Sequence, residues 1–477
     1  MEDGPPTPAP AHPPGGVLAG AKSHWPQFAA TTVVFLLVIS HYLACYIQTD
    51  MYDNVPAWPR MEEGDAMFLS WTIAGLLSYP IFAFLLEKLN RKFCIYIVSG
   101  ILIATCILYK TANTLFLFHV AHCLSAIGNT GAFIACTIYV TEIAHDNLRG
   151  SLLLWGELMY RVVHASVVFI EAFISKIPVS WFAIAPSVLV VLCFLFWLPD
   201  TPIYFLRRGN RDGAIRSLKW FRRGNTPESL MQEMENIEEV LKATRSDSVS
   251  SSNIFQDFCN RHTLRYTGIA LVLYLTETFS GDASTTWIVS VLPERLGGDF
   301  HDIVYSSAEV IFVAGTFVAF LLCDKKGRRT LLFASAVGCS VCLTPIAICS
   351  HVMSSQNEMS IEKLFAIGFA MPFIFFLALG IRTVITVVLT DIFPPKILHI
   401  HLVIRGTLDY LVNFLVVNYI NPHSWELKVL NPALFWTSSV VCTAAAVFIF
   451  KYLPETMKRP TGFVFMENRN DMLLRNM

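Results

Sequence analysis

The chain has 477 residues, a length that two or three soluble domains would fill, but its composition argues against soluble domains. Hydrophobic residues make up 54% and charged residues only 15% of the chain, whereas soluble proteins carry about 25% charged residues. The net charge of −1 does not favour nucleic acid as a partner. The 12 cysteines are scattered without metal-site spacing, so neither a metal nor a cofactor is expected. These features predict an all-α membrane protein surrounded by the lipid bilayer.

Apolar stretches follow one another along most of the chain, and a helix needs about 20 such residues to cross a bilayer. They are preceded by residues 1–27, which are rich in proline, glycine and alanine and predict a disordered tail. Six stretches come first, at residues 31–48, 66–86, 93–109, 115–140, 151–174 and 178–198. Six more come later, at residues 267–292, 303–322, 331–352, 364–390, 400–420 and 432–450. The sequence therefore predicts twelve spans in two six-helix bundles, at residues 28–198 and 263–453.

The polar interval at residues 199–262 is rich in arginine and predicts a linker with short helices, one of them at residues 231–242. Basic residues in short loops mark the cytosolic side of a membrane protein. Basic loops follow the second, fourth and eighth spans and lie on the same side as the linker. We therefore expect a multi-pass protein of the plasma membrane with both termini in the cytosol, including a tail at residues 454–477.

A charged motif occurs at matching places in the two halves. Residues 87–92 (EKLNRK) follow the second span, and residues 324–329 (DKKGRR) follow the eighth, six spans later. The acid can cap a neighbouring helix N-terminus, and the basic residues can pair with an acid at the end of another helix. Breaking such a cluster is a step in rocking one half of a transporter against the other.

Together with three further motifs in chain order, these repeats make the chain resemble the sugar porter family of the major facilitator superfamily, and within it the insect trehalose and hexose facilitators. The further motifs are residues 139–144 (YVTEIA) followed by Arg149-Gly150, residues 199–206 (PDTPIYFL) and residues 454–456 (PET). The resemblance implies the major facilitator fold and secondary transport by alternating access, with a monomer as the working unit. It assigns gating to Glu87, Arg91, Lys92, Glu142, Arg149, Asp324, Arg328, Arg329, Asp391 and Glu455.

The positions that contact sugar in that family are changed here. Residues 277–283 (ETFSGDA) stand where the family carries paired glutamines and an asparagine, and Glu157 replaces a glutamine of the fifth span. In the eleventh span, Asp409-Tyr410 replaces an Asn-Trp pair. Ionisable groups within spans are costly and usually face the bundle interior. The candidate substrate residues are Glu157, Arg161, Glu277, Thr278, Ser280, Asp282, Arg382, Thr386, Asp409, Tyr410 and Asn413.

Two interpretations of these intramembrane charges stay open. Glu157 with Arg161, and Arg405 with Asp409, have helical i,i+4 spacing, so each pair can neutralise itself and only fix helix packing. The other charges of the set have no partner within their own spans. They favour a site for a charged or zwitterionic solute, or a carboxylate that carries a proton.

The tenth span lacks the Gly-Pro-x-Pro-Trp stretch of the family and has residues 382–386 (RTVIT) instead. Because β-branched residues dominate this stretch, we predict a stiffer helix and altered gating. Three functions remain open: a facilitator for a sugar such as a hexose or trehalose, a proton-coupled or organic-ion transporter with a charged central site, and a solute sensor that does not transport. Enzymatic activity is not predicted, because the chain carries no phosphate-binding loop or nucleophile motif.

Overall fold

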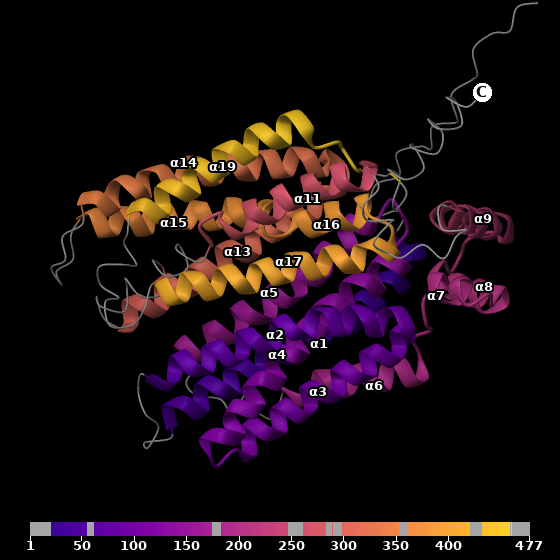
Figure 1. Ribbon diagram of the computed structural model, residues 1–477, viewed down its shortest axis with the longest axis horizontal. Coiled ribbons are helices and arrows are strands. Elements are labelled where there is room, and N and C mark those ends of the chain that lie inside the picture. The colour runs from indigo at the N-terminus through magenta and orange to yellow at the C-terminus, as the bar shows by residue number, and fades with distance from the viewer. Residues whose placement is uncertain are drawn as a thin grey trace, which may run out of the picture.

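The computed structural model describes residues 21–54, 62–173, 183–246, 261–282, 289, 298–352, 361–419, 432–457 and 459. Helices of these parts run side by side in two layers, the N-terminal half in purple and the C-terminal half in orange and yellow (Figure 1). The N-terminal half contains α1 (Ala21–Asn54), α2 (Glu62–Lys88), α3 (Arg91–Thr111), α4 (Leu115–Ile143), α5 (Arg149–Phe173) and α6 (Ile184–Phe196). The C-terminal half contains α11 (Arg261–Thr278), α13 (Gly298–Lys326), α14 (Arg328–Val352), α15 (Ile361–Leu379), α16 (Val384–Ile392), α17 (Pro395–Tyr419) and α19 (Pro432–Tyr452).

Three further helices, α7 (Pro202–Arg207), α8 (Arg211–Phe221) and α9 (Pro227–Ser246), lie outside the two layers at one end of the molecule (Figure 1). We call this end the linker end. The Thr201 hydroxyl accepts a hydrogen bond from the Tyr204 N–H and so caps α7, and the Asn210 side chain caps α8 in the same way. α9 contains residues 231–242, which confirms the helix predicted there.

Nine helical segments of the described parts are long and apolar enough to cross a membrane. They coincide with the first five predicted spans and with the eighth, ninth, tenth and twelfth. α6 is a shorter apolar helix within the predicted sixth span, and α11 and α17 overlap the seventh and eleventh, each beginning a few residues before the predicted span. The helices of the described parts are therefore consistent with the predicted count of twelve.

The outer surfaces of these helices are apolar. Leu77, Ile81 and Phe84 share one face of α2 and are 62%, 56% and 59% exposed. Val440 and Phe450 on α19 are 64% and 62% exposed. Apolar surface of this extent is unfavourable in water and suits the hydrocarbon of a bilayer, where a helix satisfies its own backbone groups.

The two halves meet mainly along two helix pairs, α5 with α13 and α2 with α17, with smaller contacts of α5 with α16 and of α4 with α17. Glycines allow close approach in the second pair: Gly75 lies against the ring of Tyr410, and Gly406 against the ring of Tyr79. A Cβ atom at either glycine would overlap the ring that it faces. Small residues at helix contacts serve this purpose in membrane proteins, since they let the helices pack tightly.

α1 begins earlier than the sequence predicts. Its first residue, Ala21, falls within the stretch assigned to a disordered tail, of which residues 1–20 lie outside the described parts. The buried side chain of Gln27 anchors this start, because it donates to the Phe221 carbonyl of α8 (3.4 Å) and accepts from the His145 N–H (3.0 Å). These partners are remote in sequence, so local composition does not reveal the start of the helix.

The helix predicted for residues 382–386 is wrong at its start, since only residues 384–386 are helical and α16 begins at Val384. A turn at residues 380–383 separates α15 from α16. The Ile381 N–H donates to the Ser335 hydroxyl of α14 (3.0 Å), and a Cβ atom at Gly380 would lie 2.6 Å from the Cβ of Ser335. Packing against α14 therefore breaks this helix without proline, and overrides the local preference of the β-branched residues.

Candidate functional site

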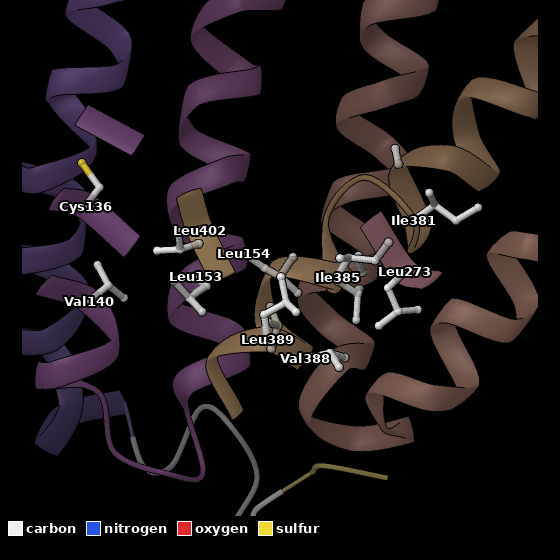
Figure 2. Close-up of a cluster of buried hydrophobic side chains, with 14 of the residues drawn as sticks. Cys136, Val140, Leu153, Leu154, Leu273, Ile381, Ile385, Val388, Leu389 and Leu402 are labelled. Atoms are coloured by element: carbon white, nitrogen blue, oxygen red, sulfur yellow. The ribbon is translucent and has the colours of Figure 1, made fainter. Parts of the chain in front are cut away.

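An apolar layer joins the two halves near the linker end. Leu153 and Leu154 of α5 belong to one buried cluster with Leu389 of α16 and Leu402 of α17, and Figure 2 shows these side chains between the helices. Each of the four is at most 5% exposed. A buried leucine contributes roughly 1.5–3 kcal/mol relative to exposure to water, so the layer favours a closed linker end.

Asp391, two residues beyond Leu389, is the centre of what we call the C-terminal ion cluster. Its carboxylate accepts from Arg149 Nη1 at 3.0 Å and from the Thr456 hydroxyl at 2.9 Å, and it lies 3.2 Å from Arg328 Nε. The two arginine side chains and the acid are at most 2% exposed. Since Arg149 belongs to α5 and Asp391 to α16, this pair fastens the two halves together.

A second contact crosses between the halves beside this cluster. The Asp324 carboxylate of α13 accepts from the Ser151 N–H at 2.8 Å and from the Ser151 hydroxyl, and pairs with Arg328 Nη2 at 2.8 Å. Ser151 lies in the first turn of α5, so Asp324 binds a helix N-terminus in the other half. This is the capping role that the repeated motif predicts for its acid.

Glu455 performs the corresponding role within the C-terminal half. Its carboxylate accepts from the N–H groups of Arg328 and Arg329, at 3.0 and 3.1 Å, at the start of α14. Gly327 precedes them with φ +93°, and a Cβ atom there would overlap the Glu455 carboxylate. Glycine is therefore required at this position both for its conformation and for its missing side chain.

The matching unit in the other half, the N-terminal ion cluster, consists of Arg91, Glu142 and Thr201. Arg91 Nη2 and Nε donate to the Glu142 carboxylate at 2.7 Å and at 3.1–3.2 Å, and the Thr201 hydroxyl donates to it at 2.5 Å. All three residues are at most 4% exposed. Because none of the three belongs to the C-terminal half, this cluster braces the N-terminal bundle with the start of the linker and does not fasten it to the other bundle.

Asp200, next to this cluster, is 6% exposed and accepts from the Thr201 N–H at 2.9 Å. Burial raises the pKa of its carboxyl to about 6, and the nearby Glu142 adds to the rise, while hydrogen bonds from backbone N–H groups oppose it. Asp200 and Glu455 stand at equivalent places in the two halves.

The structure does not bring every predicted gating residue into these clusters. Glu87, the counterpart of Asp324, is exposed. Lys92 donates to the Leu198 carbonyl at 3.5 Å, and Arg329 donates to the Phe450 carbonyl, so both basic side chains bond the backbone of a nearby helix end. Thr456, which holds Asp391, was missed by the sequence analysis, although it directly follows Glu455 of a quoted motif.

Glu277 is the centre of the charged set in the middle of the C-terminal half. Arg405 Nε and Nη2 of α17 donate to its two carboxylate oxygens at 2.8 and 2.5 Å, and Arg382 Nη1 lies 3.4 Å away. Arg382 Nε lies 3.9 Å from the Asp282 carboxylate. Glu277 thus has its partners on α17 and on the turn between α15 and α16, and Arg405 forms an ion pair between helices. Asp409 is half-buried on α17.

Arg161 lies at the contact between the halves. Its Nε donates to Glu157 at 3.0 Å, which is the i,i+4 pair that the sequence predicts. The guanidinium also lies 3.8 Å from the centre of the Phe312 ring of α13, and such a contact is favourable when the cation is shielded from water. Further along the same helix pair, His164 Nδ1 lies 2.9 Å from a Glu309 oxygen. Glu309 was missed, although an acid in an apolar span is a signal for it.

The remaining candidate substrate residues have diverse surroundings. Thr278 and Ser280 donate their hydroxyl groups to backbone carbonyls of α11, at 2.8 Å in each case. Tyr410 stacks on Trp71 of α2 with ring centroids 4.8 Å apart. Thr386 is half-buried in α16, and the side chain of Asn413 lies outside the described parts.

The chain is similar to known proteins in sequence. A family model described as sugar (and other) transporter matches residues 61–462. The facilitated trehalose transporter Tret1 of Polypedilum vanderplanki is 23% identical over 400 residues, which cover 82% of this chain and 76% of that protein. The sugar transporter ERD6-like 17 of Arabidopsis thaliana is 24% identical over 413 residues, covering 83% of this chain and 84% of its own length.

Solved structures agree on the fold. The proton:xylose symporter XylE, of the major facilitator superfamily, bound to 6-bromo-6-deoxy-D-glucose, superimposes with a TM-score of 0.77 at 17% identity. The superposition covers 94% of this chain and 99% of XylE. The inward open conformation of XylE from E. coli superimposes with a TM-score of 0.60 at 17% identity, covering 92% and 98% of the two chains.

Two helical bundles fastened at one end by paired charges, in a multi-pass membrane protein with the major facilitator fold, define a transport protein. The family model covers most of the chain, and the chain belongs to the sugar transporter family.

Proposed function

We propose that this protein carries a sugar, such as a hexose or trehalose, across the plasma membrane as a monomer that alternates between two conformations. The bundles at residues 28–198 and 263–453 rock against each other, joined by the linker at residues 199–262. The observation that carries the proposal is the pair of contacts, Arg149 with Asp391 and Ser151 with Asp324, that fastens the halves at the linker end.

The linker end faces the cytosol in this proposal. Arg207, Arg208 and Arg216 lie on α7 and α8 or directly beside them, and Lys325 and Lys326 end α13 at the same end. Basic residues concentrate on the cytosolic side of membrane proteins. Both termini then lie in the cytosol, because α1 begins and α19 ends at the linker end.

The fastened end supplies a reversible gate. In the closed state the charges satisfy one another, and when the halves separate, water takes over the same hydrogen bonds. The free-energy difference between the states is therefore small compared with the cost of leaving a single charge buried without its partner, which is about 3–5 kcal/mol. Rocking needs a bistable contact of this kind.

The central charged set leaves groups that can bind hydroxyls. The Glu277–Arg405 pair is a two-bond contact with side chains 6% and 12% exposed, which suits a scaffold. Glu157, Asp282 and Arg382 are more accessible, with side chains 29%, 34% and 31% exposed. Sugar hydroxyls donate to carboxylates and accept from guanidinium groups, so this combination of acids and a base is suited to a polyol.

Counterflow tests the proposal. Liposomes that contain the purified protein and a high internal concentration of unlabelled glucose or trehalose are diluted into labelled sugar. We expect transient accumulation of label above the level of protein-free liposomes, and loss of it in Arg149→Gln, which removes one contact between the halves. Absence of counterflow with every hexose and disaccharide would contradict sugar transport. Stabilisation of the protein by a sugar without counterflow would instead support a sensor.

A second candidate, transport of a charged solute or of a sugar together with a proton, is favoured by Arg382. Its nitrogen atoms lie 3.4 Å from Glu277 and 3.9 Å from Asp282, at or beyond hydrogen-bonding distance. A solute carboxylate could therefore pair with this guanidinium. Uptake of an organic anion that Arg382→Gln abolishes, with Lys451→Gln as the control, would favour this candidate over neutral sugar. Sugar uptake driven by a pH gradient would favour proton coupling.

One of the reasons for considering a sensor that does not transport no longer applies. It depended in part on the loss of a flexible tenth span, but a turn at residues 380–383 interrupts that span in this protein. The changed amide positions in α11 remain its support.

A further inference from the structure

The lipid-facing side of α6 ends in a tryptophan at the linker end. Leu189, Leu192, Leu195 and Phe196 are 48%, 46%, 56% and 83% exposed. Trp197 follows at the end of the helix and is 39% exposed. Tryptophan is enriched where the hydrocarbon meets the headgroups, because its ring is apolar and its N–H is a donor.

Two more tryptophans pack on this one from other elements. Trp25 of α1 stacks on Trp197 with ring centroids 6.2 Å apart, and Trp220 of α8 meets the same ring edge-on at 5.5 Å. Trp25 is 41% exposed. The three indole rings therefore form a partly exposed aromatic surface beside the apolar side of α6, and they join the first helix, the sixth helix and the linker.

Arg223 lies over this surface. Its guanidinium carbon is 5.5 Å from the centre of the Trp25 ring and 5.6 Å from that of Trp220. The side chain is exposed, and within the described parts of the chain no carboxylate forms an ion pair with it. The rings attract the cation without accepting a conventional hydrogen bond, so the N–H groups of the exposed guanidinium are available to a ligand.

Arg222, the residue before Arg223, has a structural role instead. Arg222 is 3% exposed, donates to both Glu233 oxygens at 3.0 and 3.1 Å, and donates to the Ile143 carbonyl at 2.9 Å. All of its hydrogen-bonding directions point into the protein. Two consecutive arginines thus differ sharply, and only Arg223 presents its charge outward.

We propose that Trp25, Trp197, Trp220 and Arg223 bind the phosphate of an anionic phospholipid in the leaflet at the linker end. The planar guanidinium matches the geometry of a phosphate, and no carboxylate of the described residues neutralises its charge. The apolar side of α6 supplies the surface for the acyl chains. Exposed Lys219, four residues earlier, adds positive charge that favours anionic over neutral headgroups. This site is independent of the solute that the protein carries.

The site has a consequence for the linker. α8 touches α1 through Gln27 and the Phe221 carbonyl, and Trp220 is the residue before Phe221. A headgroup that bridges Arg223 and the ring of Trp25 therefore holds α8 against the start of α1. We expect the bound lipid to raise the apparent melting temperature of the whole protein, because it binds the folded state only.

The test uses the full-length protein in mild detergent with added lipid. Phosphatidylserine should raise the melting temperature more than phosphatidylcholine does, and Arg223→Gln should lose at least half of that difference. Lys451→Gln, which removes an exposed charge from the last turn of α19, should keep it. An unchanged phosphatidylserine effect in Arg223→Gln would overturn the proposal. An equal effect of inorganic phosphate alone would overturn it as well, because the ligand would then be a free anion.

A second measurement locates the lipid. Phosphatidylserine with brominated acyl chains should quench tryptophan fluorescence more in the native protein than in Trp197→Phe, since bromine quenches only nearby rings. Arg223→Lys keeps the charge but not the planar fork, and should bind with intermediate strength. Equal quenching in the native protein and Trp197→Phe would place the lipid elsewhere and contradict the proposal.

Discussion

Each half of the protein carries at the linker end an arginine, an acid and a threonine hydroxyl that bond to one another. In the N-terminal half the acid, Glu142, is held by its own bundle. In the C-terminal half the acid, Asp391, is held by its own bundle and also by Arg149 from the other half. The same local chemistry therefore braces one bundle in the first copy and fastens two bundles together in the second.

The difference has its origin in a few residues. Arg149-Gly150 follows the fourth span, but Leu398-His399 stands where the C-terminal repeat would carry its Arg-Gly, so an equivalent arginine for Glu142 is missing from the sequence. Gly327 has φ +93°, whereas Asn90 at the matching place has φ −72°. The comparison teaches that a repeat can keep its ion pair and still lose its gating contact.

Asp391→Asn should have the largest effect. It removes the buried acid that Arg149 and Arg328 share, and loss of one partner of a buried pair costs about 3–5 kcal/mol. The halves should separate at the linker end, which exposes Cys323, a fully buried thiol whose sulfur lies beside Gly150. Maleimide labelling of Cys323 should become faster than in the native protein, with Cys323→Ser as the blank. Unchanged labelling would show that this cluster does not fasten the halves.

Glu142→Gln should destabilise the protein nearly as much as Asp391→Asn does, but the two halves should stay together at the linker end. Arg91 loses its acid inside the N-terminal bundle, at a cost of about 3 kcal/mol, so the melting temperature should fall. Labelling of Cys323 should stay slow, because the contacts of Asp391 and Asp324 between the halves are intact. If Cys323 is labelled as fast as in Asp391→Asn, the proposed difference between the two clusters is wrong.

Asp200→Asn should stabilise the protein at a pH above the pKa of Asp200, and should have little effect at acidic pH. The pKa of this acid is raised from 3.8 to about 6 in the folded protein, so the folded state binds the proton more tightly than the unfolded state. Stability therefore falls as the pH rises from about 4 to about 6, by at most about 3 kcal/mol, since one pKa unit corresponds to about 1.4 kcal/mol. The variant should melt higher than the native protein at about pH 7.5 and equally at about pH 4. A lower melting temperature at about pH 7.5 would contradict this.

Gly327→Ala and Asn90→Ala compare the turns of the two motifs. The left-handed conformation of Gly327 costs an alanine roughly 1–2 kcal/mol, before its overlap with Glu455 is counted. Asn90 has ordinary φ and its side chain makes no capping bond to α3, so alanine there should change the melting temperature little. Equal effects of the two substitutions would show that the turns are alike in function.

Predictability differed between individual residues for physical reasons. The pairing of Glu157 with Arg161 follows from helical spacing and was predictable. The ion pair between Arg405 and Glu277 was not predictable, because it depends on how α11 and α17 approach each other. Glu87 and Asp324 occupy the same motif position, yet Glu87 is exposed and Asp324 binds the N-terminus of α5, a difference that the motif itself does not contain.

The sequence by itself determined the apolar helices, the repeat of the two halves and the identity of the charged motifs. These depend on local composition and on short spacing, which the chain carries without help from distant contacts. Tertiary structure alone decided the break between α15 and α16, the early start of α1 at Gln27, and which acid each arginine meets. The reason is that these features depend on atoms brought together from helices far apart in the chain, and burial then makes every unpaired charge or backbone group costly.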